Sequence, residues 1–135
     1  MMTGDAYWAP ICELAMHLRC WSRASVSDGP NRWTTDWGQL LILPVDGYLE
    51  VAGGPCPIRQ FEWIQLSTMK LHSGLGGRPL EFVDISQEIL TNVKKHDRRF
   101  EIRDESWSIS GLFENEPVKV IQFENPFCAS TLTGR

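Results

Sequence analysis

Cysteine and histidine are the residues of this chain whose chemistry suits nucleophilic catalysis. Cys56 lies between two prolines, and His72 lies just before a glycine-rich stretch. A nearby base or cation activates a thiol by stabilising its thiolate, and a carboxylate such as Asp46 or Asp84 can orient the base. Cys56, His72 and Arg78 therefore define a candidate pocket for a small molecule or a modest enzymatic reaction. Because no spacing in the sequence brings them together, we assign no catalytic residue and keep this pocket as an alternative.

A second candidate is a zinc site near the N-terminus. Cys12, His17 and Cys20 fall within nine residues, and thiolates and imidazoles are ligands that zinc prefers. However, the spacing C-x4-H-x2-C matches no common structural zinc pattern, and the four cysteines include no C-x-x-C pair. A chain of this length also needs no disulfides for stability. We therefore expect buried, free thiols, and neither a metal nor a cofactor.

Two stretches contain residue types that bind anions. Gly74, Gly76 and Gly77 let backbone N–H groups approach a phosphate, but no Gly-Lys-Ser or Gly-Lys-Thr follows and Pro79 removes a donor. Residues 94–103 carry five lysines and arginines. Cations at the end of a helix also complement its exposed carbonyls, and neighbouring acidic residues balance these charges. We therefore predict a connector and a solvated helix end, and we do not expect nucleic acid as a partner.

Tryptophan is the unusual part of the composition, with six in 135 residues. The polar, irregular stretch 22–36 predicts a long surface loop that carries Trp33, with Trp37 at its exit. Exposed tryptophans are costly in water and are enriched at binding hot spots. We therefore predict a partner-binding surface built from Trp33, Trp37, Asp28 and Asp36. The structural alternative is that the loop folds back and both rings close the end of a sheet.

Apolar periodicity predicts two helices that would support these sites. The first covers about residues 9–21, with Pro10 at a first helical position. The second begins at a capping box formed by Asp84 and Gln87 and runs for about three turns. Each has one apolar stripe, formed by Ile11, Leu14, Ala15 and Leu18 in the first helix and by Ile85, Ile89, Leu90 and Val93 in the second.

Continuous and alternating apolar runs predict a series of strands. The strands cover residues 39–43, 48–51, 61–66 and 118–123. Asp46-Gly47 is a strong signal for the turn that joins the first two. We expect a rigid connector at residues 52–57 and a turn at residues 114–117.

A hairpin is predicted between residues 100 and 110. Its apolar residues alternate with charged residues in the first strand and with serines in the second. With the turn at residues 104–105, Ile102 faces Trp107 and Phe100 faces Ile109, so one face of the hairpin is apolar.

These elements show no βαβ alternation, which predicts an α+β fold. We expect a single domain over residues 1–124, with a largely antiparallel sheet of about five to six strands and two helices packed on one face. A flexible C-terminal tail should follow at residues 125–135. A chain of 135 residues has room for one hydrophobic core.

The composition limits the class of protein. With 42% hydrophobic and 22% charged residues, it is typical of a globular protein, and no apolar run approaches the roughly 20 residues that span a membrane. No basic region precedes the first apolar residues, so we expect no secretory signal and a cytoplasmic location. The net charge of −4 is compatible with a basic partner.

The lack of a catalytic constellation favours a binding protein over an enzyme. We expect a non-catalytic protein-binding module, in concrete form a bacterial immunity or inhibitor protein that neutralises a basic toxin or nuclease by surface occlusion. Such a protein needs complementary shape and charge but no reactive group. A third interpretation is a homo-oligomeric structural module, because an antiparallel sheet has edges that readily pair.

Overall fold

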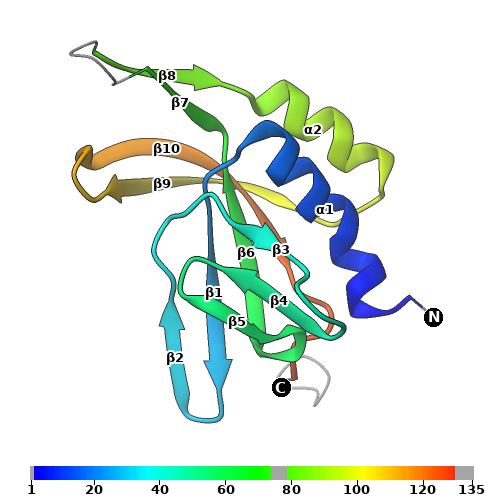
Figure 1. Cartoon of the computed structure of the whole chain (residues 1–135). Coiled ribbons are helices and arrows are strands. Elements are labelled where there is room, and N and C mark those ends of the chain that lie inside the picture. The colour runs from blue at the N-terminus through cyan, green and yellow to red at the C-terminus, as the bar shows by residue number, and fades with distance from the viewer. Residues whose placement is uncertain (1, 74–78, 130–135) are drawn as a thin grey trace.

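Antiparallel strands make up nearly half of the described chain, residues 2–73 and 79–129 of a computed structural model (Figure 1). The central sheet contains β1 (Ser22–Asp28), β2 (Asn31–Thr34), β6 (Phe61–Ser67), β9 (Glu101–Ile109) and β10 (Phe113–Glu124). These strands lie in the order β2-β1-β6-β10-β9. Two smaller sheets are formed by β3 (Leu41–Ile42), β4 (Tyr48–Val51) and β5 (Gly54–Pro57), and by β7 (Met69–Ser73) and β8 (Leu80–Asp84). The helical elements are α1 (Gly4–Leu18), α2 (Ser86–Lys95) and the short 3-10 helix η1 (Ile58–Gln60).

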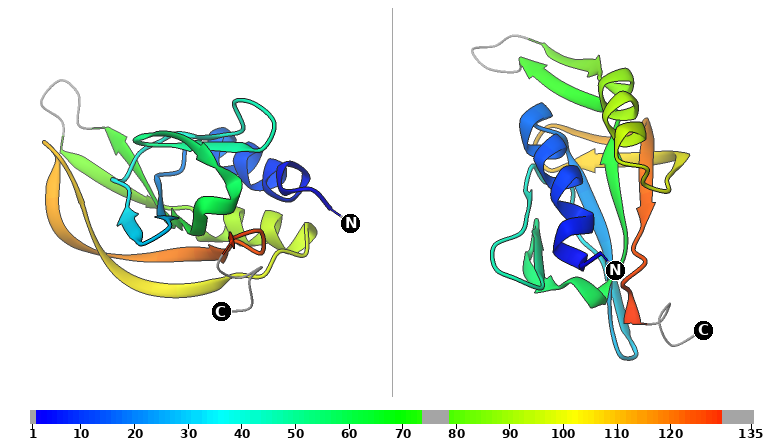
Figure 2. Two further views of the ribbon diagram at one scale, coloured as in Figure 1. Left: turned by 90° about the horizontal axis from the view of Figure 1, so that it is seen from below. Right: turned by 90° about the vertical axis from the view of Figure 1, so that its right-hand side faces the viewer.

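The predicted α+β class, with two helices packed on an antiparallel sheet, is confirmed. The helices α1 and α2 lie side by side (Figure 2), and their apolar stripes pack on the sheet face that carries Ala24, Ile64 and Ile121. The sheet β3-β4-β5 adds Leu41 and Leu49 to the same core. Removal of this apolar surface from water is the dominant favourable contribution to folding. Within the described residues, neither helix has the length and apolarity needed to cross a membrane.

A smaller apolar cluster lies on the opposite face of the central sheet. Successive residues of a strand point to opposite faces, so Val120 points away from the core residue Ile121. The strands β9 and β10 curve strongly (Figure 2), and Val120 packs there with Trp107 and Ile109. The other members of this cluster are Val118, Trp21, Trp37, Met69, Leu71 and Phe113.

The first helix begins earlier and ends earlier than the predicted range 9–21. Thr3 Oγ1 accepts a hydrogen bond from the N–H of Ala6 at 3.1 Å, which caps the N-terminus. The helix ends at Leu18 because Arg19 adopts a φ of 55°, and its N–H donates to carbonyls of the last turn. Pro10 lies inside the helix and not in its first turn. The predicted start is wrong because the cap at Thr3 and the burial of this helix outweigh the one hydrogen bond that proline removes.

The predicted capping box of Asp84 and Gln87 is not formed: the N-cap of the second helix is Ile85, without a side-chain capping hydrogen bond, and Asp84 bonds to Ser86 instead. Asp84 Oδ1 accepts hydrogen bonds from the backbone N–H and the hydroxyl of Ser86, at 2.8 and 2.6 Å. These bonds lower the pKa of Asp84 below its ordinary value. The predicted apolar stripe is confirmed, since Ile89 and Val93 are buried.

Strand β9 runs without interruption through the predicted turn at residues 104–105. The hairpin is formed instead by β9 and β10, and the turn between them contains Gly111 with a φ of 82°. Glycine adopts this conformation without strain, whereas Asp104 and Glu105 do not favour it. In one continuous strand Ile102 and Trp107 point to opposite faces, and Ile102 is 53% exposed while Trp107 is 2% exposed. The predicted hairpin is therefore wrong, although residues 101–109 do lie in a strand.

Strands β1 and β2 form a hairpin where a long loop was predicted over residues 22–36. The turn between them contains Gly29, with a φ of 61°, followed by Pro30. The strand β1 could not be recognised from its polar composition, because two of its serines, Ser22 and Ser25, are buried and hydrogen-bonded in the fold. Ser25 Oγ, for example, donates to Glu62 Oε1 at 2.7 Å. A buried hydroxyl is tolerated when it is hydrogen-bonded.

The remaining predicted strands agree with the structure to different degrees. Those over residues 48–51, 61–66 and 118–123 are confirmed, and the strand over 39–43 shortens to β3. The predicted connector over 52–57 contains β5, and the predicted turn over 114–117 lies within β10. Asn115, with a φ of 51°, lies where the β9–β10 register shifts, so an irregular strand had been predicted as a turn.

Asn125 ties the end of β10 to α1 and η1. Its Oδ1 accepts a hydrogen bond from Trp8 Nε1 at 3.3 Å, and its Nδ2 donates to the carbonyls of Ile58 at 2.8 Å and Phe61 at 2.7 Å. Asn125 and Trp8 are both buried. The segment predicted as a flexible tail, residues 125–135, thus begins with a buried and hydrogen-bonded side chain. Residues 130–135 lie outside the described residues.

We predict that Asn125→Ala lowers the free energy of unfolding by about 3 kcal/mol, because it leaves a buried indole N–H and two buried carbonyls without partners. Equilibrium unfolding in urea measures this change. As a control, Gln87→Ala on the exposed surface of α2 should change stability by less than about 0.5 kcal/mol. Equal stability of the two variants would contradict this role of Asn125.

Candidate functional site

The segment that follows β2 places Trp37 against the β9–β10 hairpin. The rings of Trp37 and Trp107 meet edge to face, with centroids 5.4 Å apart and planes at 79°. The guanidinium carbon of Arg23 lies 4.9 Å from the centroid of the Trp37 ring on its face, an arrangement in which the cation interacts with the ring electrons. Trp37 is thus held between a cation and a buried ring and remains half-buried.

A groove with a volume of about 660 Å³ opens between this segment and the tip of the hairpin. We call it the Trp37 groove. Its apolar lining comes from Trp37, Leu112 and Phe113, and the exposed acids Asp36 and Glu114 also line it. Leu112 is 51% exposed, which is unusual for a large apolar side chain beside other apolar surface.

The apolar surface of the groove continues onto the arm formed by β7 and β8. The ring of Phe82 lies 5.3 Å from that of Phe113 and 6.2 Å from that of Trp107, measured between centroids. Phe82 is 43% exposed. Trp37, Phe82, Trp107 and Phe113 thus form one aromatic surface that is open to solvent at its rim, a composition typical of binding hot spots.

Two indole groups near this surface lack hydrogen-bond acceptors. The Nε1 atoms of Trp21 and Trp37 are buried, and neither finds an acceptor among the described residues. A buried donor without a partner is destabilising, and most such donors in proteins are bonded to protein or water. The N–H of Trp37, a residue that lines the groove, is itself covered, so a ligand or water can bond to it only when a neighbouring side chain moves aside.

Arg23 is fixed by a chain of polar side chains that crosses the sheet face. Its Nε donates to Gln65 Oε1 at 2.8 Å, its NH2 group donates to Glu105 Oε2 at 3.1 Å, and Gln65 Nε2 donates to Gln122 Oε1 at 2.8 Å. Gln65 and Gln122 are buried. Burial lowers the pKa of Arg23, and Glu105 opposes this shift. The chain of hydrogen bonds fixes the cation on which Trp37 stacks.

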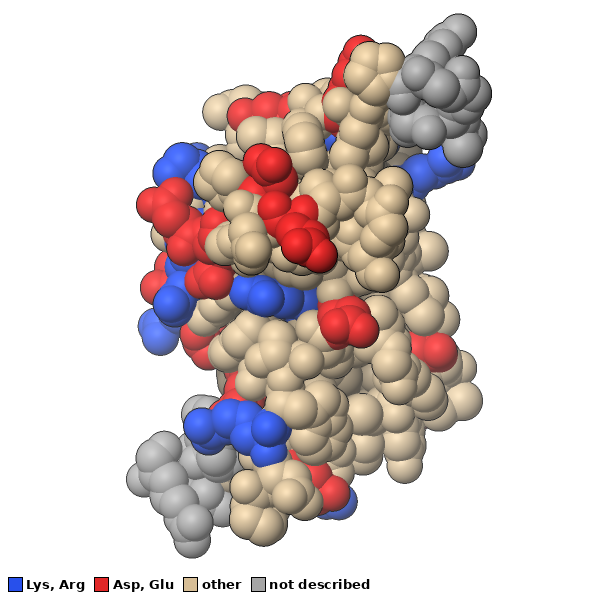
Figure 3. All heavy atoms as spheres, turned by 90° about the vertical axis from the view of Figure 1, so that its left-hand side faces the viewer, with Lys and Arg blue, Asp and Glu red and all other residues tan. Residues whose placement is uncertain are grey.

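The residues of this hydrogen-bonded chain belong to no sequence motif and are not part of the predicted site. They are Arg23, Gln65, Glu105 and Gln122. The signal that identifies them is a polar residue between two buried apolar residues, as in Ile64-Gln65-Leu66 and Ile121-Gln122-Phe123. This pattern is typical of a strand with one polar face. Figure 3 shows that acidic and basic side chains alternate over one half of the face it presents and are sparse on the other half.

The four residues of the predicted binding surface lie in two places. Asp36 and Trp37 both line the groove. Trp33 lies opposite Val26 in the β1–β2 pair, and Asp28 lies opposite Asn31 near the tip of the same hairpin. Because paired residues share a face, Trp33 projects on the side of the buried Val26, whereas Trp37 packs in the cluster on the other face.

The alternative pocket is not assembled among the described residues. Cys56 lies on β5 opposite Leu49, whereas His72 lies on β7 opposite Glu81. In Figure 1, β7 lies in the upper half of the molecule and β5 in the lower half. Arg78 and the glycine-rich stretch 74–78 lie outside the described residues.

The candidate zinc ligands near the N-terminus, Cys12, His17 and Cys20, are not arranged as a metal site. Cys12 and Cys20 are buried, and burial raises the pKa of each thiol to about 12. A zinc ligand must be a thiolate, so protonated thiols do not favour the metal. His17 is exposed on α1. Within residues 2–73 and 79–129, no group of three or more histidine, cysteine or acidic side chains is placed to hold a metal ion.

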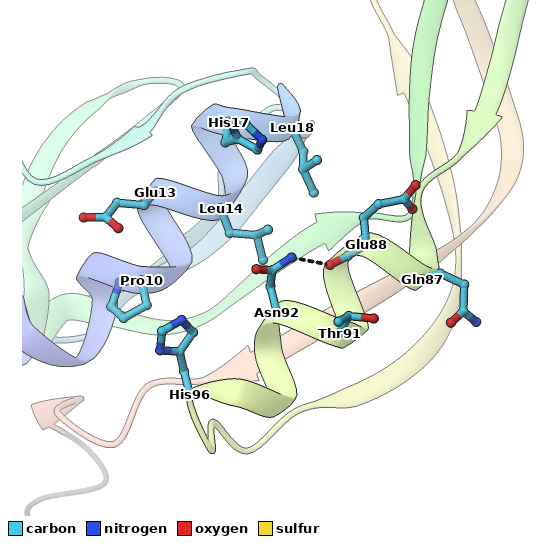
Figure 4. Close-up of a pocket in the computed structure, with 10 residues that line it drawn as sticks. All are labelled: Pro10, Glu13, Leu14, His17, Leu18, Gln87, Glu88, Thr91, Asn92 and His96. Carbon is cyan, nitrogen blue, oxygen red and sulfur yellow. Dashed lines mark hydrogen bonds between the residues drawn. The ribbon is translucent and has the colours of Figure 1, made fainter.

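A second hollow, of about 760 Å³, lies between α1 and α2 (Figure 4), and we call it the cleft between the helices. Leu14 and Asn92 face each other across its centre, while Glu13 points away from α2. Asn92 Nδ2 donates to the backbone oxygen of Glu88 at 2.7 Å. The lining includes the imidazoles of His17 and His96, which can transfer protons, but no thiol. The cleft therefore lacks the nucleophile that the predicted Cys–His chemistry requires.

We predict that Cys56 alkylates slowly in the folded chain. Burial and the charge of Asp28 raise the pKa of the Cys56 thiol, so it stays protonated at neutral pH, where the thiolate is the reactive form. Iodoacetamide labelling at pH 7.5, followed by peptide mass spectrometry, should show slower reaction than for the urea-unfolded chain. Faster labelling of Cys56 in the folded state would contradict this and restore it as a candidate nucleophile.

In comparisons with known proteins, no protein-family model, curated protein or solved structure matches the chain.

Proposed function

We propose that this chain is a non-catalytic protein-binding module whose Trp37 groove receives a segment of a basic protein partner. The observation that carries the proposal is the half-buried ring of Trp37, whose N–H lacks an acceptor among the described residues, beside the acids Asp36 and Glu114. Aromatic rings provide apolar contact area, and the two carboxylates favour lysine or arginine. The N–H adds one directed donor when the side chains that cover it move aside on binding.

In its concrete form, the proposal is a bacterial immunity or inhibitor protein that blocks a basic toxin or nuclease by surface occlusion. Occlusion requires complementary shape and charge and no reactive group, which agrees with the placement of Cys56 and His72 on separate strands, β5 and β7. The net charge of −4 favours encounter with a cationic partner. We place the chain in the cytoplasm, where thiols such as those of Cys12, Cys20 and Cys56 stay reduced.

The test compares proteins captured by three forms of the chain from its own host. Asp36→Asn with Glu114→Gln removes two charges at the groove, and Glu13→Gln with Glu88→Gln removes the same charges at the cleft between the helices. We expect a basic protein that the wild-type and cleft variants retain in equal amount and that the groove variant loses. The loss should be greatest at low salt, because screening weakens exposed charge pairs.

A third variant tests the contribution of the indole N–H separately from that of the aromatic ring. Trp37→Phe keeps an aromatic ring and removes the donor, so we expect the Kd for the captured partner to rise about fivefold, equivalent to about 1 kcal/mol. Titration calorimetry with the purified partner measures this change. Equal capture by all three forms, together with an unchanged Kd for Trp37→Phe, would show that the groove is not the binding surface.

A further inference from the structure

The two edges of the central sheet differ in how they are protected. The edge strand β9 carries Glu101, Arg103, Asp104 and Glu105, and charges of this kind prevent pairing with another sheet. The opposite edge strand, β2, is short, and all four of its residues are exposed. Its single charged side chain, Arg32, is paired with Glu62 at 2.9 Å, and Trp33 beside it is 44% exposed.

The hydrogen-bonding groups of β2 that face outward follow from the register. Thr35 N–H donates to the carbonyl of Ala24 at 2.9 Å, and Trp33 lies opposite Val26. Hydrogen-bonded pairs alternate along an antiparallel ladder, so Trp33 directs its N–H and C=O toward β1. Arg32 and Thr34, on either side of it, therefore direct their N–H and C=O groups away from the sheet.

We propose that two copies of this chain pair through β2, antiparallel, about a two-fold axis that passes beside Trp33. In this register Arg32 of one copy lies opposite Thr34 of the other, and each pair exchanges both of its outward backbone hydrogen bonds. The two Trp33 residues then form a non-hydrogen-bonded pair with Cα atoms about 4.5 Å apart, the closest side-chain contact in a sheet. The two central sheets become one continuous sheet.

Other two-fold registers lose essential groups. An axis beside Arg32 places the two guanidinium groups opposite each other, and it places Thr34 opposite Pro30, which has no N–H. An axis beside Thr34 requires residue 36 in the strand, but β2 ends at Thr34. An axis between residues would pair side chains from opposite faces, which the pleat forbids. The edge is therefore self-complementary in the Trp33 register.

This inference does not depend on the Trp37 groove, because Trp33 and Trp37 lie on different faces of the sheet. The contact is short. Stable protein interfaces bury about 1,200 Å² or more, so a four-residue strand should give a weak dimer that forms as concentration rises.

The first experiment is sedimentation velocity of the full chain from micromolar to millimolar concentration. We expect the mass to rise from that of the monomer toward twice that value. Trp33→Lys should abolish the rise, since it places like charges opposite each other, whereas Ile102→Lys on the other edge strand should not. Both sites are exposed, and thermal unfolding checks that each variant folds.

The second experiment tests the register. Under mild oxidation Trp33→Cys should form an intermolecular disulfide between the two thiols at position 33, because their Cα separation suits such a bond. Arg32→Cys should not link to itself, and peptide mass spectrometry distinguishes the links. A monomeric mass at all concentrations, a dimer lost only in Ile102→Lys, or a link between two thiols at position 32 would overturn the proposal.

Discussion

The stacking of Arg23 on Trp37 is the interaction on which the candidate site depends. The guanidinium carbon lies 4.9 Å from the ring centroid, and the same group is bonded to Gln65 and Glu105. Gln65 is in turn bonded to Gln122 on the next strand. The position of Trp37, which lies outside any strand, is thus fixed by side chains from four strands of the central sheet: β1, β6, β9 and β10. A preorganised aromatic side chain loses less conformational freedom on binding.

The side chains on the two faces of the central sheet differ, so one face forms the main core and the other forms the candidate binding surface. One face is covered by both helices and by β3-β4-β5 and forms the main core. The other carries polar residues in its middle and the aromatic cluster at one end. The strands β9 and β10 curve strongly (Figure 2), and the tip of their hairpin lines the groove together with residues 36–37. A binding surface at the end of a rigid sheet does not require the core to change when a partner binds.

The sequence predicted the elements that have strong periodicity and missed those that depend on distant contacts. The helix stripe of Ile89 and Val93 and the strand 61–66 were predictable because buried residues recur at regular spacing. Strand β1 was not, since its buried serines acquire partners only in the fold, such as Glu62. The hairpin turn contains Gly111, but it was predicted at residues 104–105, because the alternation of apolar residues alone does not locate a turn. For the site, the tryptophans of the predicted surface loop pointed to Trp33 and Trp37. Only the fold shows that these two residues lie on different faces of the sheet and that Arg23 stacks on Trp37.

The central claim is that partners bind at the Trp37 groove. Amide hydrogen exchange measured by mass spectrometry, on the chain alone and with its captured partner, tests it most directly because it requires no substitution. We predict slower exchange in the complex at residues 36–37 and 108–114, with no change at residues 87–96 of the cleft between the helices. Slower exchange at residues 87–96, with the groove unaffected, would contradict the account and move the binding surface to α1 and α2.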